Sequence, residues 1–246
     1  MKLVLLGTTG YHPNGRRQTA CLMLPEVGVI LDAGTGIFRA GKLLRTKTLD
    51  IYLTHAHLDH VIGLTFLFDV LAGKQPVSVR VHGAAEKLVA IDTHLFAPDL
   101  FPARPPFEWR PLQSTNPLPG GGQLASFPLD HPGGSLGFRL DWPGHSLAYV
   151  TDTTARPDAL YVAAIHGVDL LVHECNFTDE QADWAEKTGH SCLTPVLQIA
   201  AAARVKRLIL THFDSLSEAD DPVGLAAKKH LFPAAEIGSD GQEVEF

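Results

Sequence analysis

The sequence predicts an α+β fold in which two mixed β-sheets are flanked by helices. Short apolar runs of β type alternate with helical patterns along nearly the whole chain, but not in the strict strand–helix–strand order of one parallel sheet. The chain has 246 residues, 45% of them hydrophobic, which is enough to bury a sizeable core in one large domain. We therefore expect a single domain over residues 1–246.

The first part of the chain reads as strands followed by alternating helices and strands. Strands are expected at residues 3–6, 20–24 and 27–32, with the last two joined as a hairpin across Pro25 and Glu26. Further on, the expected elements are a strand at 51–54, a helix at 61–72 that Gly73 ends, a strand at 77–82 and a helix at 84–96.

Seven prolines lie between Ala97 and Pro119. Proline removes a backbone donor and fixes φ, so we expect no regular structure through this segment. Two interpretations stay open, a proline-stiffened surface loop and a lid over a site, because long ordered loops in compact domains are often functional.

The second part resumes the alternation. Its expected strands lie at 123–129, 137–141, 146–150, 169–173 and 208–211. Its expected helices lie at 156–165, 194–203 and 222–230.

Composition excludes several classes of protein. The three cysteines are odd in number and widely spaced, which argues against a disulfide framework and suits a reducing, cytoplasmic location. No apolar run is long enough for a membrane-spanning helix, so we expect no membrane association. The net charge of −7 offers no long-range attraction to nucleic acid.

A histidine cluster indicates metal chemistry. The pattern His55-x-His57-x-Asp59-His60 lies between an expected strand and an expected helix. At a strand end, His55 and His57 point the same way and can bind one metal, whereas Asp59 and His60 lie past the turn, face elsewhere and suit a second. Imidazole and carboxylate ligands favour zinc, with manganese or iron as the alternatives.

Other strand ends carry single polar residues of the same kinds. His131, Asp152 and His212 each follow an apolar strand directly, where loops commonly carry functional groups on a rigid scaffold. Each is weak evidence alone, because a lone aspartate or histidine there is usually a cap or a turn former. Together with the histidine cluster, they form a coherent candidate set of metal ligands.

These residues resemble the metallo-β-lactamase superfamily over essentially the whole chain, including Asp32 in Leu31-Asp32-Ala33-Gly34. The resemblance implies an αββα sandwich with two metal ions. The implied ligands are His55, His57 and His131 for the first, Asp59, His60 and His212 for the second, and Asp152 as the bridge. Asp32 is implied to support the histidine loop rather than to bind metal.

Two further segments resemble the ribonuclease Z and small phosphodiesterase branch. One is Leu6-Gly7-Thr8-Thr9-Gly10 with Arg16 and Arg17 following, and the other is His173-Glu174-Cys175 with Gly189-His190-Ser191. The resemblance implies that Glu174 orients His190, which acts near the scissile phosphate. Asn176 and Cys192 depart from the residues usual in that branch. We expect Asp59, Glu174 and His190 to be the catalytic residues.

One departure bears on the substrate. Ribonuclease Z enzymes carry a tRNA-gripping arm between the ligands that correspond to His131 and Asp152, but here these residues are only 21 positions apart. We therefore expect a small or cyclic nucleotide-type phosphodiester as the substrate, cleaved by a hydroxide that bridges two Zn²⁺ ions. The alternatives are tRNA 3′ processing and a lactonase or thioesterase activity on the same metals. A homodimer is left open.

Overall fold

The computed structural model describes residues 1–74 and 77–246, which divide into two compact units. The first unit comprises residues 1–13, 17–114 and 240–245, and the second comprises 14–16, 115–239 and 246. The prediction of one domain over the whole chain stays a prediction.

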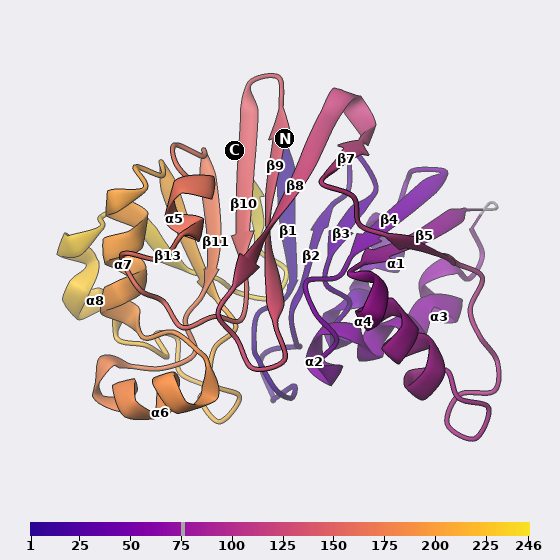
Figure 1. The fold of residues 1–246 in the computed structure, drawn as a ribbon, viewed down its shortest axis with the longest axis horizontal. Helices are drawn as coiled ribbons and strands as arrows, with labels where there is room; N and C mark the ends of the chain where they lie inside the picture. The colour runs from indigo at the N-terminus through magenta and orange to yellow at the C-terminus, as the bar shows by residue number, and fades with distance from the viewer. Residues whose placement is uncertain (75–76) are drawn as a thin grey trace. The chain divides into compact units, whose positions relative to one another are not determined.

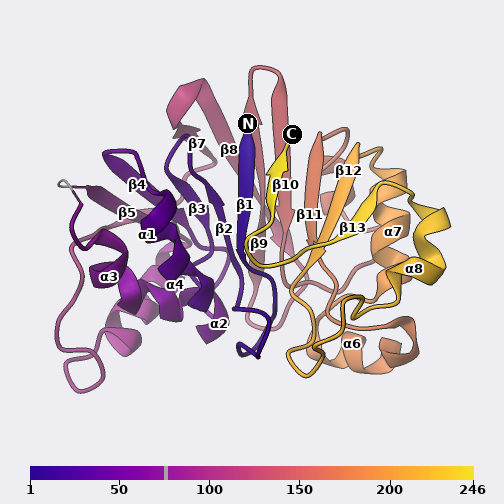
Figure 2. The same cartoon turned by 180° about the vertical axis from the view of Figure 1, so that it is seen from behind.

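The first unit contains a mixed seven-stranded sheet in the order β14-β1-β2-β3-β4-β5-β6. Its strands are β1 (Lys2–Gly7), β2 (Cys21–Leu24), β3 (Val29–Leu31), β4 (Thr48–Tyr52), β5 (Ser78–Gly83), β6 (Glu108–Pro111) and β14 (Glu243–Glu245). Pairing is antiparallel from β14 to β3 and parallel from β3 to β6. Figure 2 shows the yellow strand β14 beside the indigo strand β1. The predicted early hairpin is confirmed as β2 and β3.

Short helices cover one face of this sheet (Figure 1). They are α1 (Ala40–Leu43), α2 (Leu58–Val61), α3 (Leu67–Leu71) and α4 (Ala85–Ala90). Apolar side chains of strands and helices form one core, with Met23, Ile30 and Ile51 from the sheet packing with Leu64 and Leu67. The buried helix face is what anchors these short helices, since isolated helices of this length are unstable in water.

The helix predicted at 61–72 is interrupted. It consists of the end of α2, a 3₁₀ segment at Ile62–Phe66, and α3. Gly63 explains the interruption, because its N–H donates to the carbonyl of Ala33 at 2.8 Å. A Cβ at position 63 would lie 2.2 Å from the carbonyl oxygen of Gly34. This close tertiary contact overrides the helical pattern of the sequence.

The second unit contains another mixed seven-stranded sheet, in the order β13-β12-β11-β10-β9-β8-β7. Its strands are β7 (Thr115–Leu118), β8 (Gly122–Leu129), β9 (Ser135–Trp142), β10 (His145–Val150), β11 (Leu170–Glu174), β12 (Arg207–Thr211) and β13 (Ala235–Ile237). β10 to β13 are parallel, and β7 to β10 are antiparallel. The connection from β9 to β10 is a tight hairpin at Pro143-Gly144.

The helices of the second unit are α5 (Tyr161–Ala164), α6 (Ala182–Thr188), α7 (Leu193–Ala202) and α8 (Leu225–Lys228). α7 buries Leu193, Val196 and Leu197 in the same core as Ala148 and Leu171 of the sheet. In Figures 1 and 2, α7 and α8 lie side by side next to this sheet. The helix predicted at 156–165 is shorter, because residues 156–159 form an isolated turn before α5, at Pro157.

The prediction that the proline-rich segment has no regular structure is wrong for two stretches. β6 is the edge strand of the first sheet and ends at Pro111, and β7, which contains Pro117, is the edge strand of the second. Edge strands tolerate proline because one side of the backbone needs no ladder hydrogen bond. Residues 97–107 contain no helix or strand, as predicted.

Candidate active site

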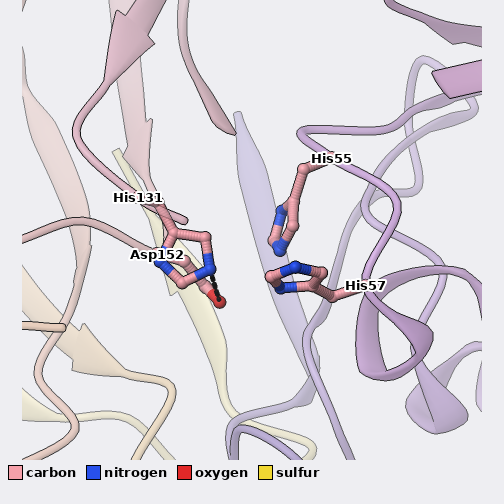
Figure 3. Close-up of side chains that lie close together, drawn as sticks. All are labelled: His55, His57, His131 and Asp152. Atoms are coloured by element: carbon pink, nitrogen blue, oxygen red, sulfur yellow. Dashed lines mark ion pairs between the residues drawn. The ribbon is translucent and has the colours of Figure 1, made fainter. Parts of the chain in front are cut away.

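The histidine cluster of the first unit lies in the loop after β4 and in α2. His55 and His57 project from the loop, and their ring centroids are 4.5 Å apart (Figure 3). Asp59 and His60 lie in α2, with Oδ2 of Asp59 3.4 Å from Nε2 of His60. The four predicted side chains of this unit are therefore close neighbours.

One local detail of the prediction is wrong. β4 ends at Tyr52, so His55 and His57 belong to an irregular loop and do not alternate along a strand. The His60 ring lies near this pair, with its centroid 4.2 Å from that of His55. The short connection explains this, because α2 begins at Leu58 and turns the chain back at once.

Asp32 supports this cluster, as the family resemblance implied. Its buried carboxylate accepts hydrogen bonds from the backbone N–H and the hydroxyl of Thr54, at 2.8 and 2.9 Å. It also accepts from Nδ1 of His60 at 2.9 Å. The Thr54 hydroxyl donates its proton to Asp32, so its oxygen accepts a hydrogen bond from Nδ1 of His55 at 3.0 Å. With protons on both Nδ1 atoms, Nε2 of each ring keeps the lone pair that a metal ligand needs.

In the second unit, the remaining candidates follow four strands at the same edge of one sheet. His131 follows β8, Asp152 follows β10, Glu174 ends β11 and His212 follows β12. β10, β11 and β12 are parallel, and β8 runs in the same direction because two antiparallel pairings separate it from β10. The carboxyl ends of such strands are the usual location of ligand sites in sheets of this kind.

Asp152 lies between two histidines of this edge. Its Oδ2 atom is 3.6 Å from Nε2 of His131, shown by the dashed line in Figure 3, and its Oδ1 atom is 3.2 Å from Nε2 of His212. All three side chains are buried. Each carboxylate oxygen thus faces a different imidazole nitrogen.

Gly189 fixes the orientation of His131. Nδ1 of His131 donates to the carbonyl of Gly189 at 2.8 Å, which again leaves Nε2 with its lone pair. Gly189 has φ 76° at the end of α6, and a Cβ there would lie 2.2 Å from Cδ of Pro132. Burial lowers the pKa of His131, which favours the neutral ring that binds metals.

Glu174 and His190 form the pair that the resemblance implied. Nδ1 of His190 lies 3.0 Å from Oε1 of Glu174, whose side chain is fully buried. Donor atoms of Glu174, His190 and His212 all lie within 4.8 Å of one another. The His190 ring stacks on that of His212, with centroids 5.4 Å apart. His190 is therefore held beside a candidate metal ligand.

Several supporting residues were not predicted. The backbone N–H groups of Thr153, Asn176 and Ser191 donate to the Glu174 carboxylate, at 2.9, 3.2 and 3.2 Å. The Asn176 side chain donates to the carbonyl of His212 at 2.9 Å. Backbone donors leave no trace in residue identity, so the sequence carries no signal for these contacts.

His82, near the end of β5, has a structural role. It pairs with the buried Asp50 at 2.8 Å and stacks on Tyr52 with ring centroids 4.3 Å apart. Both contacts hold this partly buried histidine in place.

A sequence profile described as a beta-lactamase superfamily domain matches residues 28–213. The chain belongs to this superfamily. The matched range takes in the histidine cluster, Glu174, His190 and His212. Together with the relatives below, it identifies this member as a ribonuclease Z-like metallo-β-lactamase-type protein and a metal-dependent hydrolase.

Curated relatives match nearly end to end. A protein named ribonuclease Z from Methanosarcina acetivorans is 25% identical over 315 positions, covering 100% of this chain and 98% of the relative. One of the same name from Bradyrhizobium diazoefficiens is 28% identical and covers 98% of each. An alignment of 315 positions against 246 residues leaves 69 positions with no residue from this chain.

Solved structures share the fold. The metallo-β-lactamase fold protein YhfI from Bacillus subtilis has a TM-score of 0.79, 18% identity and 99% coverage of both chains. The human short-form tRNase Z has a TM-score of 0.74, 21% identity, and coverage of 100% of this chain and 99% of its own. A diphosphatase of the PhnP family has a TM-score of 0.73, 20% identity, and coverage of 100% and 97%. The predicted fold class, two mixed sheets flanked by helices in the metallo-β-lactamase fold, is confirmed.

No helix within residues 1–74 and 77–246 combines the length and the apolar character needed to cross a bilayer. Cys21, Cys175 and Cys192 are buried free thiols. A cytoplasmic location and a homodimer stay predictions.

Proposed function

We propose that this chain hydrolyses phosphodiester bonds with two divalent metal ions. The observation that carries the proposal is the hydrogen bond from His190 to the buried Glu174, beside a set of histidine and aspartate donors. The histidine and aspartate donors alone are enough to hold metal ions in a hydrolase of this superfamily. An oriented carboxylate–histidine pair next to them adds a general acid, which phosphodiester cleavage requires to release its leaving oxygen.

The residues present fit a divalent metal. The proposed ligands are His55, His57 and His131 for the first ion, Asp59, His60 and His212 for the second, and Asp152 shared between them. The protonated Nδ1 atoms of His55, His60 and His131 support this assignment, because each ring offers Nε2 as its donor. Nitrogen and oxygen donors of this kind suit zinc, manganese or iron.

Bound metals would supply a water of lowered pKa as the nucleophile and would offset charge on the phosphate oxygens. The protein groups supply the rest. Glu174 holds His190 through Nδ1, so Nε2 lies on the opposite side of the ring and can give a proton to the leaving oxygen. Asp152 can serve two ions because its two oxygens face two different histidines.

Two substrate classes are supported by different observations. The names of the curated relatives favour precursor tRNA, and they favour it over the small phosphodiester that the sequence predicts. The chain's own features favour a small substrate: only the hairpin of β9 and β10 separates His131 from Asp152, and the net charge is −7. The basic side chain of Arg39 is engaged by Asp240 at 2.6 Å. Binding RNA requires many phosphate contacts.

The decisive experiment compares both classes in one buffer. Metal-loaded protein is assayed for kcat/KM with bis(4-nitrophenyl) phosphate and with precursor tRNA at about 0.15 M salt, where exposed charges are screened beyond about 8 Å. Cleavage of either supports phosphodiester hydrolysis, and their ratio assigns the substrate class. Turnover of neither, with hydrolysis of a lactone or thioester instead, would overturn the proposal.

A variant pair tests the general acid. On a substrate whose leaving oxygen is an alkoxide, such as precursor tRNA or a cyclic nucleotide, His190→Ala should lower kcat by roughly 10²- to 10⁴-fold, the usual contribution of such a group. The matched control is His166→Ala, because His166 is an exposed histidine of the same unit that is remote in sequence from every proposed ligand. Equal activity of the two variants would remove His190 from the mechanism.

A further inference from the structure

A cavity of about 490 Å³ adjoins His190 in the second unit. This volume lies within the range of small-molecule sites, roughly 300–1,000 Å³. Two chain segments lead into it from the proposed site: Asp152 is followed after two residues by Ala155, and His190 is followed after one by Cys192. The cavity is thus built from the same loops that carry the proposed general acid and the proposed bridging ligand.

Small apolar groups form much of the wall. Ala155, Ala185 and Cys192 are buried, and Ala182 and Pro195 complete this surface from α6 and α7. Burial raises the pKa of Cys192 to about 11, so its thiol stays protonated at neutral pH and acts as apolar surface. A flat, apolar molecule would find dispersion contacts on these groups.

The polar groups of the cavity already satisfy one another. The carboxylate of Asp179 accepts from the backbone N–H and hydroxyl of Thr194, at 2.9 and 2.6 Å, and from Nζ of Lys228. Glu186 pairs with Arg156 at 2.5 Å. The Asp179 carboxylate therefore binds the first turn of α7 through Thr194.

The charged groups of the lining are already paired. Asp179 pairs with Lys228, Glu186 with Arg156, and His190 with Glu174. Burial alone would raise the pKa of Asp179, but hydrogen bonds from Lys228 and Thr194 outweigh it and lower this pKa, so the carboxylate is ionised at neutral pH. A second phosphate would have to compete with these carboxylates for their cations, whereas a neutral ring needs no cation.

We propose that this cavity binds the organic group on the leaving oxygen of the substrate, a neutral aromatic ring such as a nucleobase or a phenol ring. The inference rests on the proposed function. A group that protonates the leaving oxygen must lie within hydrogen-bond reach of it, so the substituent on that oxygen extends into the space next to His190. The apolar walls and the paired charges of the lining favour a neutral ring there.

Ala182→Trp tests the proposal by filling the cavity from an exposed position at the start of α6, where the larger side chain need not disturb the core. Ala201→Trp is the matched control, because Ala201 is an exposed alanine of α7 outside the cavity. Thermal unfolding of both variants monitors folding. The substrate is methyl 4-nitrophenyl phosphate, whose only ring is on the leaving oxygen.

We expect Ala182→Trp to raise KM for this substrate by about tenfold or more, the scale of losing one buried ring. The substitution should change KM more than kcat, because the ring makes the same contacts in the bound substrate and in the transition state. In titration calorimetry, adenosine should bind the wild type and Ala201→Trp with the same Kd. It should bind Ala182→Trp at least tenfold more weakly.

The outcomes separate the two proposals. Hydrolysis by the wild type with an unchanged KM in Ala182→Trp would overturn the leaving-group cavity and leave phosphodiester hydrolysis intact. A raised KM for bis(4-nitrophenyl) phosphate but not for the methyl ester would also overturn it, because the ring bound would be the one that stays on phosphorus. A wild type that hydrolyses no phosphodiester would overturn both.

Discussion

Glu174→Gln should destabilise the protein far more than a surface charge change would. The Glu174 side chain is fully buried, and its two oxygens accept four N–H groups. Thr153 and His190 donate to Oε1, and Asn176 and Ser191 donate to Oε2. Glutamine keeps the shape of the side chain but turns one oxygen into an NH₂ group. In either orientation of the amide, two of the four N–H groups then point at this NH₂ group and lose their acceptor.

The magnitude follows from these four contacts. A buried donor that loses its acceptor costs about 1–3 kcal/mol, so two such donors cost about 2–6 kcal/mol. Native proteins are stable by only about 5–15 kcal/mol, and the variant should therefore unfold at a markedly lower urea concentration. Activity should fall as well if the NH₂ group points to His190.

The assay is urea unfolding followed by circular dichroism, with kcat/KM measured on the folded fraction. Glu236→Gln is the control, since Glu236 lies in the same unit in a half-exposed pair with Arg207 at 3.0 Å, and such surface pairs contribute at most about 1 kcal/mol. An unfolding midpoint of Glu174→Gln equal to that of the control would refute the reasoning, because the buried carboxylate would then not organise its four donors.

Three further predictions concern the same unit. Asp152→Ala should abolish activity and most of the second metal, which elemental analysis would measure; two retained ions would contradict the bridging assignment. Tyr161→Phe should lower the free energy of unfolding by about 1–3 kcal/mol, since the Tyr161 hydroxyl donates to Nε2 of the buried His173 at 2.9 Å; an unchanged urea midpoint would argue against it. Burial lowers the pKa of His173 from 6.5, so the unfolded chain binds a proton that the folded chain does not. Stability should be full above pH 6.5 and fall below it, and His173→Gln should flatten that dependence.

The local pattern of His55, His57, Asp59 and His60 was visible in the sequence because four ligand-type residues lie within six positions. The candidates far from this cluster in the sequence could be predicted in two ways: Asp152 because it follows an expected strand, and Glu174 because its segment resembles a known family. Strand positions could be predicted because buried strands are continuous apolar runs. Helix limits could not, because contacts such as Gly63 against Ala33 are set by the tertiary structure.

The cavity beside His190 was also beyond prediction. It is formed by Ala155, Asp179, Cys192 and Lys228, which are far apart in the sequence and carry no shared pattern. Only the packing of α6, α7 and α8 brings them together. Its charge balance depends on which carboxylates are already paired, and that is a property of the folded chain alone.

Asp32 and His212 both have a φ of 58°, in the left-handed region that most side chains avoid. Such a conformation costs a residue other than glycine about 1–2 kcal/mol, although aspartate and histidine tolerate it better than most. Glycine at position 32 would relieve this strain, but it would leave the donors of Thr54 and His60 without their acceptor, at about 1–3 kcal/mol each. A laboratory selection for thermal stability alone should therefore keep aspartate at this strained position, so it would preserve the support of the histidine loop without ever scoring activity.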